Sequence, residues 1–477
     1  MTSARLVDLL GGVDVVETSG AVGEVVVSSL TQRSSDVQPG WLFCCRRGSG
    51  ADGHDYAADA VARGASALIV ERPLRLPVTQ VVVHDVGRVL STVAAAFWGH
   101  PSAGLKLVGV TGTNGKTTTT YLVRAILEQH GWPTGVIGTL TGPLTTPEPI
   151  DLQRHLAGFV GSGHRAVAME VSSHGLSQHR VDSTSFTVGI FTNLDRDHLD
   201  YHDDMETYFS VKEELFDPTR TEVGVVNADD SWGTRLLARP RIPMVSFSVD
   251  DVSDLVIEPN ATTFRWHAQR IRLGLPGQFN VSNAVAAATA TRILGVPATT
   301  IAEALSGAAA PPGRMEHIDA GQPYRVVVDC AHTPSALRQV LETISVTTSG
   351  RLLVVFGCGG DRDRTKRPEM GALVARYAHV GILTTDNPRS ESVKRIFNDV
   401  LAGSGTSRLI LEPDRRRAIA DALADAKPDD TLLIAGKGDQ TVQQIGRVAI
   451  PFDDRAVARK EIVAAQGRIT VGAHDAT

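Results

Sequence analysis

The sequence contains few cysteines and aromatic residues, and it has neither a long apolar run nor a block of like charge. Of its 477 residues, 4 are cysteine and 5% are aromatic, and 47 Lys and Arg residues are set against 53 Asp and Glu residues. No stretch approaches the roughly 18 apolar residues of a membrane-spanning helix. No run of about five or six like charges suggests the basic face of a nucleic-acid-binding protein. We therefore expect neither a membrane nor a nucleic acid as partner.

The cysteines give no sign of a metal site. Cys44, Cys45, Cys330 and Cys358 include no CxxC pair, and their spacing matches no zinc motif. Cys44 and Cys45 fall in an apolar stretch, which favours small core residues in a reducing compartment. The N-terminal segment MTSARLVDLLGG lacks the apolar region of a secretory signal. These features predict a cytoplasmic protein.

The composition provides enough apolar material for several packed domains. Hydrophobic residues make up 42% and charged residues 21% of the chain, as in ordinary folded proteins. At roughly 100–200 residues per domain, this length predicts two to four domains. Candidate boundaries are the glycine- and proline-containing segments Gly99–Gly104 and Pro311–Gly313. We predict three domains, residues 1–104, 105–310 and 311–477.

Short apolar runs alternate with helix-length segments along most of the chain. In the first hundred residues, Ala21–Leu30 and Ala67–Glu71 resemble strands, and Asp55–Gly64 resembles a helix with a glycine cap. Further strand-like runs follow at Leu105–Val110, Ala166–Val171, Val188–Phe191, Val223–Val226, Arg325–Asp329, Leu352–Phe356, Val380–Thr384 and Thr431–Ala435. Such alternation predicts an α/β fold with largely parallel sheets, in which ligands bind beyond the carboxyl ends of the strands.

The most specific motif is a glycine loop, GVTGTNGKTTTT, at Gly109–Thr120. It lies between an apolar run and a helix-like segment, Lys116–Gln129, which is the context of a phosphate-binding loop. Glycines let backbone N–H groups approach phosphate closely, and the helix dipole favours an anion there. Lys116 would reach the β- and γ-phosphates of ATP, and the Thr117 hydroxyl would bind Mg²⁺. The alternative is a plain glycine turn with a solvated lysine.

At this loop the chain resembles the Mur ligases, which build the peptide stem of the bacterial cell wall. The resemblance runs from about Ser34 to about Gln440 and is strongest to the MurE branch. It implies a UDP-substrate-binding N-terminal domain, a central P-loop domain with a parallel sheet, and a Rossmann-like C-terminal domain that binds the acceptor. The implied reaction joins a carboxylate of a UDP-muramoyl-dipeptide to an amino acid through an acyl-phosphate, with ATP consumed. Family members are commonly monomers or weak dimers that act on small molecules.

The resemblance also implies ATP and metal ligands. The segment MEVSSHGLSQHR makes Glu170 a Mg²⁺ ligand, and NLDRDHLDYH places His198 near a second Mg²⁺. Lys212 matches the lysine that these ligases carry as a carbamate formed with CO₂, although spacing alone would favour an ordinary surface lysine. Lys116, His198 and Lys212 are the implied catalytic residues, and Thr117 joins Glu170, His198 and carbamylated Lys212 as metal ligands. The implied ATP contacts are Gly112, Thr113, Asn114, Gly115, Lys116, Thr117, Thr118, Asn280, Arg314, Asp329 and His332.

Further motifs imply contacts to the two other substrates. Contacts to the UDP-linked dipeptide would come from Ser34, Thr145, Thr146, Ser172 and Arg180. The DNPR sequence that ends at Arg389 is the signature of the diaminopimelate-adding branch, in which the arginine grips a carboxylate of the acceptor through its paired N–H groups. The implied acceptor contacts are Asn387, Arg389, Asp439 and Gln440.

The sequence departs from the family pattern at three sites. Arg33-Ser34-Ser35 stands where the family usually has Asp-Ser-Arg, Cys330 replaces a tyrosine, and Asp439-Gln440 replaces the end of the GKGHE signature. Gln440 is neutral, so it cannot form the charge-assisted hydrogen bond that a glutamate offers to an acceptor ammonium. Two interpretations stay open, namely a MurE-like ligase of a specialised pathway with a changed amine acceptor and an ordinary diaminopimelate ligase.

Two other classes of protein are consistent with parts of the sequence. A folate- or cyanophycin-type ligase would share the phosphate loop, but the TTP element at Thr145–Pro147 and the EVSSHGL segment argue against it. A non-catalytic binding protein on an inherited fold is the second alternative. The intact set of Lys116, Thr117, Glu170 and Lys212 argues against that alternative, because binding alone does not need them.

Overall fold

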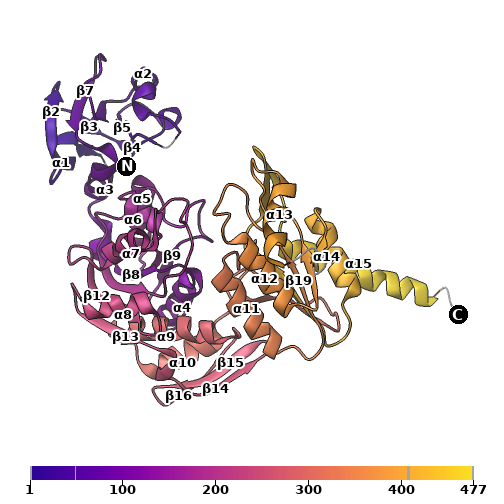
Figure 1. Ribbon diagram of the computed structural model, residues 1–477. Coiled ribbons are helices and arrows are strands. Elements are labelled where there is room, and N and C mark those ends of the chain that lie inside the picture. The colour runs from indigo at the N-terminus through magenta and orange to yellow at the C-terminus, as the bar shows by residue number, and fades with distance from the viewer. Residues whose placement is uncertain (1–2, 49, 405–408, 475–477) are drawn as a thin grey trace.

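The computed structural model describes residues 3–48, 50–404 and 409–474. Three α/β units follow one another along the chain, and each is built on its own sheet. The first unit, in indigo, is joined to the second, in magenta, and the third, in orange and yellow, lies beside the second (Figure 1). The predicted three-unit α/β architecture is confirmed.

The first unit carries a five-stranded sheet in the order β2-β7-β6-β5-β4, parallel except for the edge pair β2-β7. Its strands are β2 (Val15–Ser19), β4 (Ser29–Thr31), β5 (Trp41–Cys44), β6 (Ala67–Val70) and β7 (Thr79–Val83). Around the sheet lie the pair β1 (Ala4–Arg5) and β3 (Val26–Val27), helices α1 (Leu6–Leu9), α2 (Ala57–Ala62) and α3 (Val86–Phe97), and the 3₁₀ turns Ser34–Asp36 and Gly53–Tyr56.

Two sequence-based predictions for this unit have different outcomes. The helix expected over 55–64 is α2, and the left-handed φ of +98° at Gly64 confirms its glycine cap. The strand expected over 21–30 is wrong as a single element, because the Glu24 N–H donates to the Ala21 carbonyl at 2.9 Å and so forms a turn ahead of β3 and β4. Gly20 and Gly23 mark this turn within the apolar pattern.

The second unit is built on six parallel strands in the order β13-β12-β11-β8-β10-β9. These are β8 (Lys106–Thr111), β9 (Thr134–Ile137), β10 (Ala166–Glu170), β11 (Phe186–Phe191), β12 (Thr221–Asn227) and β13 (Met244–Phe247). Side chains alternate between the two faces, as strand geometry requires. Val108 and Val110 therefore share an apolar cluster with α4, α9 and α10, whereas Leu107 shares one with α5 to α8.

The helices of this unit are α4 (Lys116–Gln129), α5 (Pro149–Gly161), α6 (Ser173–Ser177), α7 (Met205–Glu213), α8 (Ser231–Ala238), α9 (Gln278–Ile293) and α10 (Ala298–Gly307). Short 3₁₀ turns occur at Pro101–Gly104, Glu214–Phe216 and Val249–Asp251. An antiparallel meander of β14 (Ser253–Glu258), β15 (Ala261–Trp266) and β16 (Gln269–Leu273) packs against α9 and α10. The helix Lys116–Gln129 predicted after the glycine loop is confirmed with the same bounds as α4.

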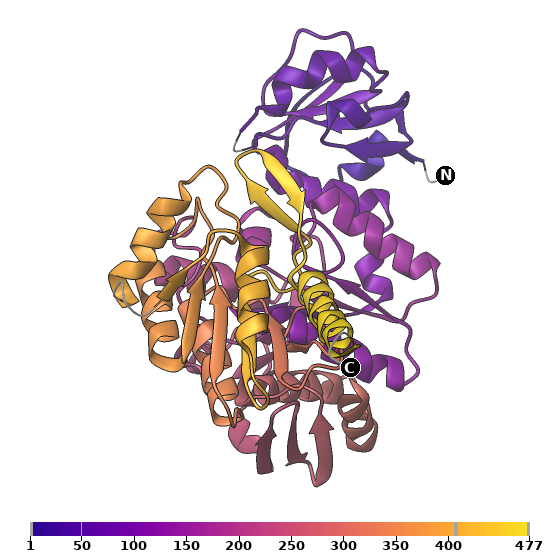
Figure 2. The same cartoon turned by 90° about the vertical axis from the view of Figure 1, so that its right-hand side faces the viewer.

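The third unit has the strand order β17-β18-β22-β19-β20-β21, in which only the edge strand β17 is antiparallel. Its strands are β17 (Glu316–His317), β18 (Arg325–Asp329), β19 (Leu352–Phe356), β20 (Val380–Leu383), β21 (Leu409–Leu411) and β22 (Thr431–Ala435). One face is covered by α11 (Pro334–Val346), α12 (Arg367–Tyr377) and α13 (Val393–Ser404), the other by α14 (Arg415–Asp425) and α15 (Asp454–His474). Figure 2 shows the hairpin of β23 (Val442–Ile445) and β24 (Val448–Pro451) projecting from this unit in yellow.

The apolar cores divide the molecule unevenly. One cluster runs without a break from α4 and α9 of the second unit into α11, α12 and α13 of the third. The first unit has its own clusters, which receive only Ile150 from the second unit. Burial of Cys44 and Cys45 confirms that these two cysteines are core residues, and Cys358 is buried as well. Within the ranges that the structure describes, no helix is both long and apolar enough to cross a bilayer.

Candidate active site

The predicted site residues gather around one cavity of about 540 Å³ between the second and third units. It lies where the carboxyl ends of both parallel sheets meet, which is the expected position for a ligand in such folds. Its lining includes the following predicted residues: Thr113, Asn114, Gly115, Lys116, Thr117, Thr118, Thr145, Glu170, His198, Asn280, Arg314, Asp329, His332, Asn387, Arg389, Asp439 and Gln440. Of the other predicted residues, Gly112, Thr146, Ser172, Arg180 and Lys212 flank this lining, and Ser34 lies in the first unit.

The phosphate loop joins β8 to α4. Gly112 and Gly115 have φ angles of +140° and +86°, which L side chains rarely adopt. A Cβ at Gly112 would come within 1.9 Å of the Thr192 hydroxyl, so this position has no room for a side chain. The Lys116 ammonium folds back over the loop and donates to the Gly112 and Thr113 carbonyls at 2.9 and 2.8 Å. The loop therefore presents the N-terminus of α4 and a lysine to the cavity, as phosphate binding requires.

Glu170 places a carboxylate at the inner end of the phosphate loop. Its side chain is 1% exposed, and it accepts hydrogen bonds from the Thr117 hydroxyl at 3.0 Å and from the Thr139 N–H at 2.9 Å and hydroxyl at 3.1 Å. Within the described chain, no lysine, arginine or histidine forms an ion pair with it. A buried carboxylate without a cationic partner is costly. Because Mg²⁺ prefers oxygen ligands, the donor set of Thr117 and Glu170 fits that ion.

Lys212 is also buried, with 1% exposure. Its ammonium donates to the Gly112 carbonyl at 3.0 Å and lies 4.7 Å from the centre of the Tyr208 ring. Burial lowers the pKa of Lys212 well below its usual value of 10.5, and the nearby Lys116 lowers it further. Among the described residues, no carboxylate forms an ion pair with Lys212. The interpretation of Lys212 as an ordinary surface lysine is therefore wrong, and burial favours the neutral form of its amine.

His198 lies in a group of histidines on the segment between β11 and α7. Its imidazole is 3.5 Å from the Asp197 carboxylate and packs edge-on against His174, with ring centres 4.9 Å apart. Burial lowers the pKa of His198 to about 3, although Asp197 acts in the opposite direction. The imidazole is consequently neutral near pH 7, which is the form that binds metal ions.

The nucleotide side of the cavity also receives residues from the third unit. The Arg314 guanidinium donates to the Thr117 hydroxyl and to the Asp439 carboxylate, both at 3.3 Å, and contacts the Cys330 thiol. Asp329 accepts from the Met315 and Ala331 N–H groups at 2.8 Å each, so it shapes the loops on either side of it. Asn280 donates to the Pro276 carbonyl at 2.8 Å, and the His332 ring contacts the Cys330 carbonyl at 2.7 Å.

Ion pairs join the second and third units at the rim of the cavity. The segment 196–200, which contains His198, faces the loop 359–367 of the third unit. Three pairs link them: Arg196–Asp363 at 3.6 Å, Asp197–Lys366 at 3.8 Å and Asp200–Arg362 at 3.8 Å. Asn114 of the phosphate loop adds a hydrogen bond to the Ser335 hydroxyl at 3.2 Å. The predicted metal and acceptor regions are thereby held against each other.

Two of the predicted acceptor residues, Asn387 and Gln440, form a polar cluster with Lys437 at the end of β22. Lys437 is fully buried, and its ammonium donates to Asn387 at 3.2 Å, to Gln440 at 3.4 Å and to the Val442 carbonyl at 2.6 Å. Asn387 Nδ2 donates to the same Gln440 oxygen at 2.7 Å. Because two donors converge on this oxygen, the Gln440 amide must turn its NH₂ group elsewhere. Burial lowers the pKa of Lys437.

The predicted dipeptide contacts lie beside the cavity, towards the first unit. The Thr146 hydroxyl bonds the Glu170 carbonyl at 3.0 Å and the Ser172 hydroxyl at 3.1 Å, and the Ser172 hydroxyl in turn caps α6. Arg180 donates to the Thr146 carbonyl at 2.7 Å and pairs with Glu148 at 2.9 Å. Glu148 also contacts Arg46, which belongs to the first unit. The cationic groups near this junction suit an anionic substrate.

Sequence reasoning missed several residues of this region. Thr139, Lys366 and Lys437 were not singled out, although Thr139 and Lys437 each come two residues after a strand. Thr139 comes two residues after β9 and bonds Glu170. Position at the carboxyl end of a parallel strand was the available signal for it.

Comparison with known proteins gives consistent results for all three units. Sequence profiles described as Mur ligase family catalytic domain, Mur ligase middle domain, and Mur ligase glutamate ligase domain match residues 26–98, 110–291 and 313–438. The chain is 41% identical to the UDP-N-acetylmuramoyl-L-alanyl-D-glutamate–2,6-diaminopimelate ligase of Geobacter metallireducens, with 94% of this chain and 97% of that protein covered. Identity to the protein of the same name from Clostridioides difficile is 38%, over 96% and 99% of the two chains.

Solved structures show the same similarity. A ligase of that name is 30% identical with a TM-score of 0.67, and the match covers 98% of this chain and 100% of that one. MurF from Acinetobacter baumannii is 20% identical with a TM-score of 0.70, over 93% and 96% of the two chains, and so shares the fold.

Proposed function

The chain belongs to the Mur ligase family of ATP-dependent ligases, and we propose that it joins an amino acid to the dipeptide carboxylate of UDP-N-acetylmuramoyl-L-alanyl-D-glutamate. The observation that carries this proposal is the set of residues that line one cavity. Lys116, Thr117 and Glu170 line one part of it and would bind the nucleotide and a metal ion, and Asn387 and Arg389 line another part and would bind the acceptor. The relatives that match nearly the whole chain are named for the same dipeptide.

The activation half of the reaction uses the residues around the phosphate loop. ATP would phosphorylate the glutamyl side-chain carboxylate, giving an acyl-phosphate and ADP. Lys116 and Arg314 would neutralise charge on the transferring phosphoryl group, so catalysis rests mainly on positioning and electrostatics. Thr117 and Glu170 would hold one Mg²⁺, which supplies further charge neutralisation when bound.

We propose that Lys212 is carbamylated and, with His198, serves a second Mg²⁺. A neutral amine can attack the carbon of CO₂, forming an N–C bond and releasing one proton to solvent. The lowered pKa of Lys212 favours that neutral amine. The product is an anionic oxygen ligand, which suits Mg²⁺ and would sit beside the Gly112 carbonyl that the lysine already contacts.

The acceptor half uses the third unit. Arg389 would take a carboxylate of the incoming amino acid, whose amine then attacks the acyl-phosphate and displaces phosphate. The interdomain ion pairs support this geometry, because they join the segment that contains His198 to the loop 359–367 on the acceptor side of the cavity.

Diaminopimelate is the first candidate acceptor, since the relatives quoted above are named for it. A specific observation favours a second candidate, an amino acid without a distal ammonium. Gln440 is neutral, and its oxygen is already engaged by Asn387 and Lys437. Its free NH₂ group is a hydrogen-bond donor, which suits a carbonyl or carboxylate better than an ammonium.

Phosphate release by the purified chain tests the proposal. The assay contains ATP, Mg²⁺, bicarbonate and the UDP-linked dipeptide, with meso-diaminopimelate, L-lysine or a single-amine amino acid added one at a time. Release that depends on both the dipeptide and an amino acid supports the ligase. Release with no combination contradicts it and favours the non-catalytic alternative, whereas release with folate-type substrates would place the chain in another branch.

Gln440→Glu tests the acceptor assignment. A glutamate there regains a charge for an acceptor ammonium, and a charge-assisted hydrogen bond is about twice as strong as a neutral one. If a single-amine acceptor is preferred by the natural chain, the variant should shift kcat/KM towards diaminopimelate by about tenfold. A natural chain that already prefers diaminopimelate would identify an ordinary ligase of the diaminopimelate-adding branch.

Light scattering during gel filtration tests the proposal of a monomer or weak dimer.

A further inference from the structure

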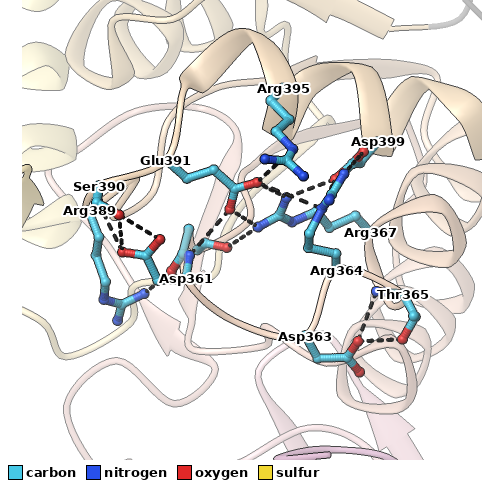
Figure 3. A network of polar contacts seen from close by, with 12 residues as sticks. Asp361, Asp363, Arg364, Thr365, Arg367, Arg389, Ser390, Glu391, Arg395 and Asp399 are labelled. Carbon is cyan, nitrogen blue, oxygen red and sulfur yellow. Dashed lines mark hydrogen bonds and ion pairs between the residues drawn. The ribbon is translucent and has the colours of Figure 1, made fainter. Parts of the chain in front are cut away.

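Arg367, at the start of α12, is fully buried although it carries a positive charge. Its guanidinium forms two bonds to the Glu391 carboxylate, at 2.7 and 2.9 Å, and one to Asp399 at 2.8 Å. A fourth bond reaches the Gly359 carbonyl at 3.0 Å. Figure 3 shows this arginine at the centre of a network that joins α12, α13 and two loops. A buried guanidinium with this many directed bonds fixes the position of each partner.

The partners of Arg367 lie on both loops that surround Arg389. Glu391 receives the Asp361 N–H at 3.2 Å, and the Asp361 carboxylate holds Ser390 through its N–H at 3.0 Å and its hydroxyl at 2.9 Å. The Gly360 N–H donates to the Asn387 carbonyl at 2.9 Å. The loop 359–361 and the loop 387–391 are therefore cross-linked on either side of Arg389.

Arg389 itself is held in an unusual backbone conformation. Its φ is +50°, in the left-handed region that costs a non-glycine residue energy. Its guanidinium donates to the Gly360 carbonyl at 2.7 Å, and its own N–H and carbonyl pair with Gln444 and Gly446 of the hairpin at 3.1 and 2.7 Å. The fit is close, because a Cβ at Gly360 would come within 1.9 Å of the Pro388 carbonyl.

We propose that Arg367 is a positioning residue that sets Arg389 for the acceptor carboxylate, acting through Glu391 and the 359–361 loop. The inference rests on the proposed function of Arg389 and names a residue that does not itself reach the cavity. Loss of the Arg367 bonds frees the two loops, and Arg389 then loses both its Gly360 contact and its strained backbone conformation. A small displacement of such a group weakens acceptor binding without altering the phosphate loop, which lies on the second unit.

Arg367→Lys tests the proposal in the full-length chain. Lysine keeps the charge but lacks the planar fork, so it cannot hold Glu391, Asp399 and Gly359 together. The KM for the acceptor amino acid should rise roughly tenfold or more, because a displacement of about 1 Å can cost up to about 100-fold. The KM for ATP should change less than about twofold. Arg364→Lys is the matched control. Arg364 shares the Asp399 partner at 2.9 Å and lies 3.8 Å from Glu391, but it is 44% exposed and, among the described residues, makes no bond to Gly359.

A double variant separates positioning from a general structural effect. If Arg367 acts through Arg389, Arg367→Lys added to Arg389→Lys should raise the acceptor KM little beyond Arg389→Lys alone. Additive effects, or equal changes in the KM for ATP and acceptor, would overturn the proposal. Should Arg367→Lys fail to fold, Glu391→Gln provides the same comparison, because it weakens the same contact from the other side. If Arg389→Lys leaves the acceptor KM unchanged, the proposed function of Arg389 fails. If Arg389→Lys raises the acceptor KM but Arg367→Lys leaves it unchanged, only the positioning role of Arg367 fails.

Discussion

The Thr117 hydroxyl lies 3.0 Å from the Glu170 carboxylate, although 53 positions separate the two residues in sequence. Parallel pairing of β8 with β10 brings them together, since Thr117 follows the first strand and Glu170 ends the second. The hydroxyl and the carboxylate are thus delivered to one point by the sheet rather than by a local motif. Their metal-binding role is the first feature to test.

Glu170→Gln should lower activity by about 100-fold at low Mg²⁺, with partial recovery as the Mg²⁺ concentration rises. The amide keeps an oxygen for Thr117 and Thr139 but removes the charge that the ion requires. Phosphate release measured across a Mg²⁺ series provides the readout. Glu128→Gln, on the surface of α4 where its partner is Arg124, should match the natural chain. An unchanged Mg²⁺ requirement in Glu170→Gln would exclude the metal role.

Lys212→Arg should abolish any stimulation by bicarbonate and lower activity by about 100-fold, because arginine stays charged and cannot form a carbamate. In the natural chain, NMR with ¹³C-bicarbonate should show a carbamate carbonyl resonance that the variant lacks. Burial lowers the pKa of Lys212 and so favours the neutral amine. Because carbamate formation from that amine releases a proton, carbamate occupancy at fixed dissolved CO₂ should increase between pH 7 and 9. Equal resonances in both chains would place the carbamate elsewhere.

Asp454→Ala should destabilise the chain by about 3–5 kcal/mol, the usual cost of leaving one member of a buried ion pair alone. Asp454 and Arg415 are both fully buried and bond at 2.7 and 2.8 Å, and Arg415 also donates to the Ala435 carbonyl at 3.0 Å. Urea unfolding followed by circular dichroism measures the change. Arg416→Ala removes an exposed pair with Glu461 and should cost about 0.5 kcal/mol or less. Similar losses for both variants would contradict the buried-pair argument.

His202 should make stability depend on pH in the acid range. Burial, with the nearby His174 as a further cause, lowers the pKa of His202 to about 4. Between that value and 6.5, the usual pKa of an exposed histidine, the unfolded chain binds more protons than the folded chain, so the free energy of unfolding falls as pH drops through this window. His202→Gln, measured in EDTA at pH 7 and pH 5, should lose less stability between the two conditions. His84→Gln, at an exposed position, should behave as the natural chain does.

Much of the fold could be predicted because its signals are local. The bounds of α4 follow from the glycine loop before Lys116 and from Gly131 after the helix, and buried parallel strands such as β19 read as unbroken apolar runs. The meander β14 to β16 was missed because its strands form no unbroken apolar run. They alternate apolar with charged residues, as in Gln269–Leu273.

The candidate site divides in the same way. Motifs led to Lys116, Thr117 and Glu170, which the fold brings together. No local pattern could predict that Asp197 would face Lys366, because their contact depends on how the third unit packs against the second. The burial of Lys212 could not be predicted from its own helix either, since the Gly112 carbonyl that it contacts belongs to the phosphate loop, whose packing against α7 the sequence does not reveal.

The uneven division of the apolar cores limits which parts of the chain can be exchanged with those of a relative. The first unit keeps its own core and takes only Ile150 from its neighbour, whereas the second and third units share one continuous cluster. In a chimera with a distant relative, a graft of residues 1–104 would disturb few packed side chains, but a graft of the third unit would cut through a common interior. We expect recombination to treat this chain as two parts rather than three, with the first unit free to change and the second and third units inherited together.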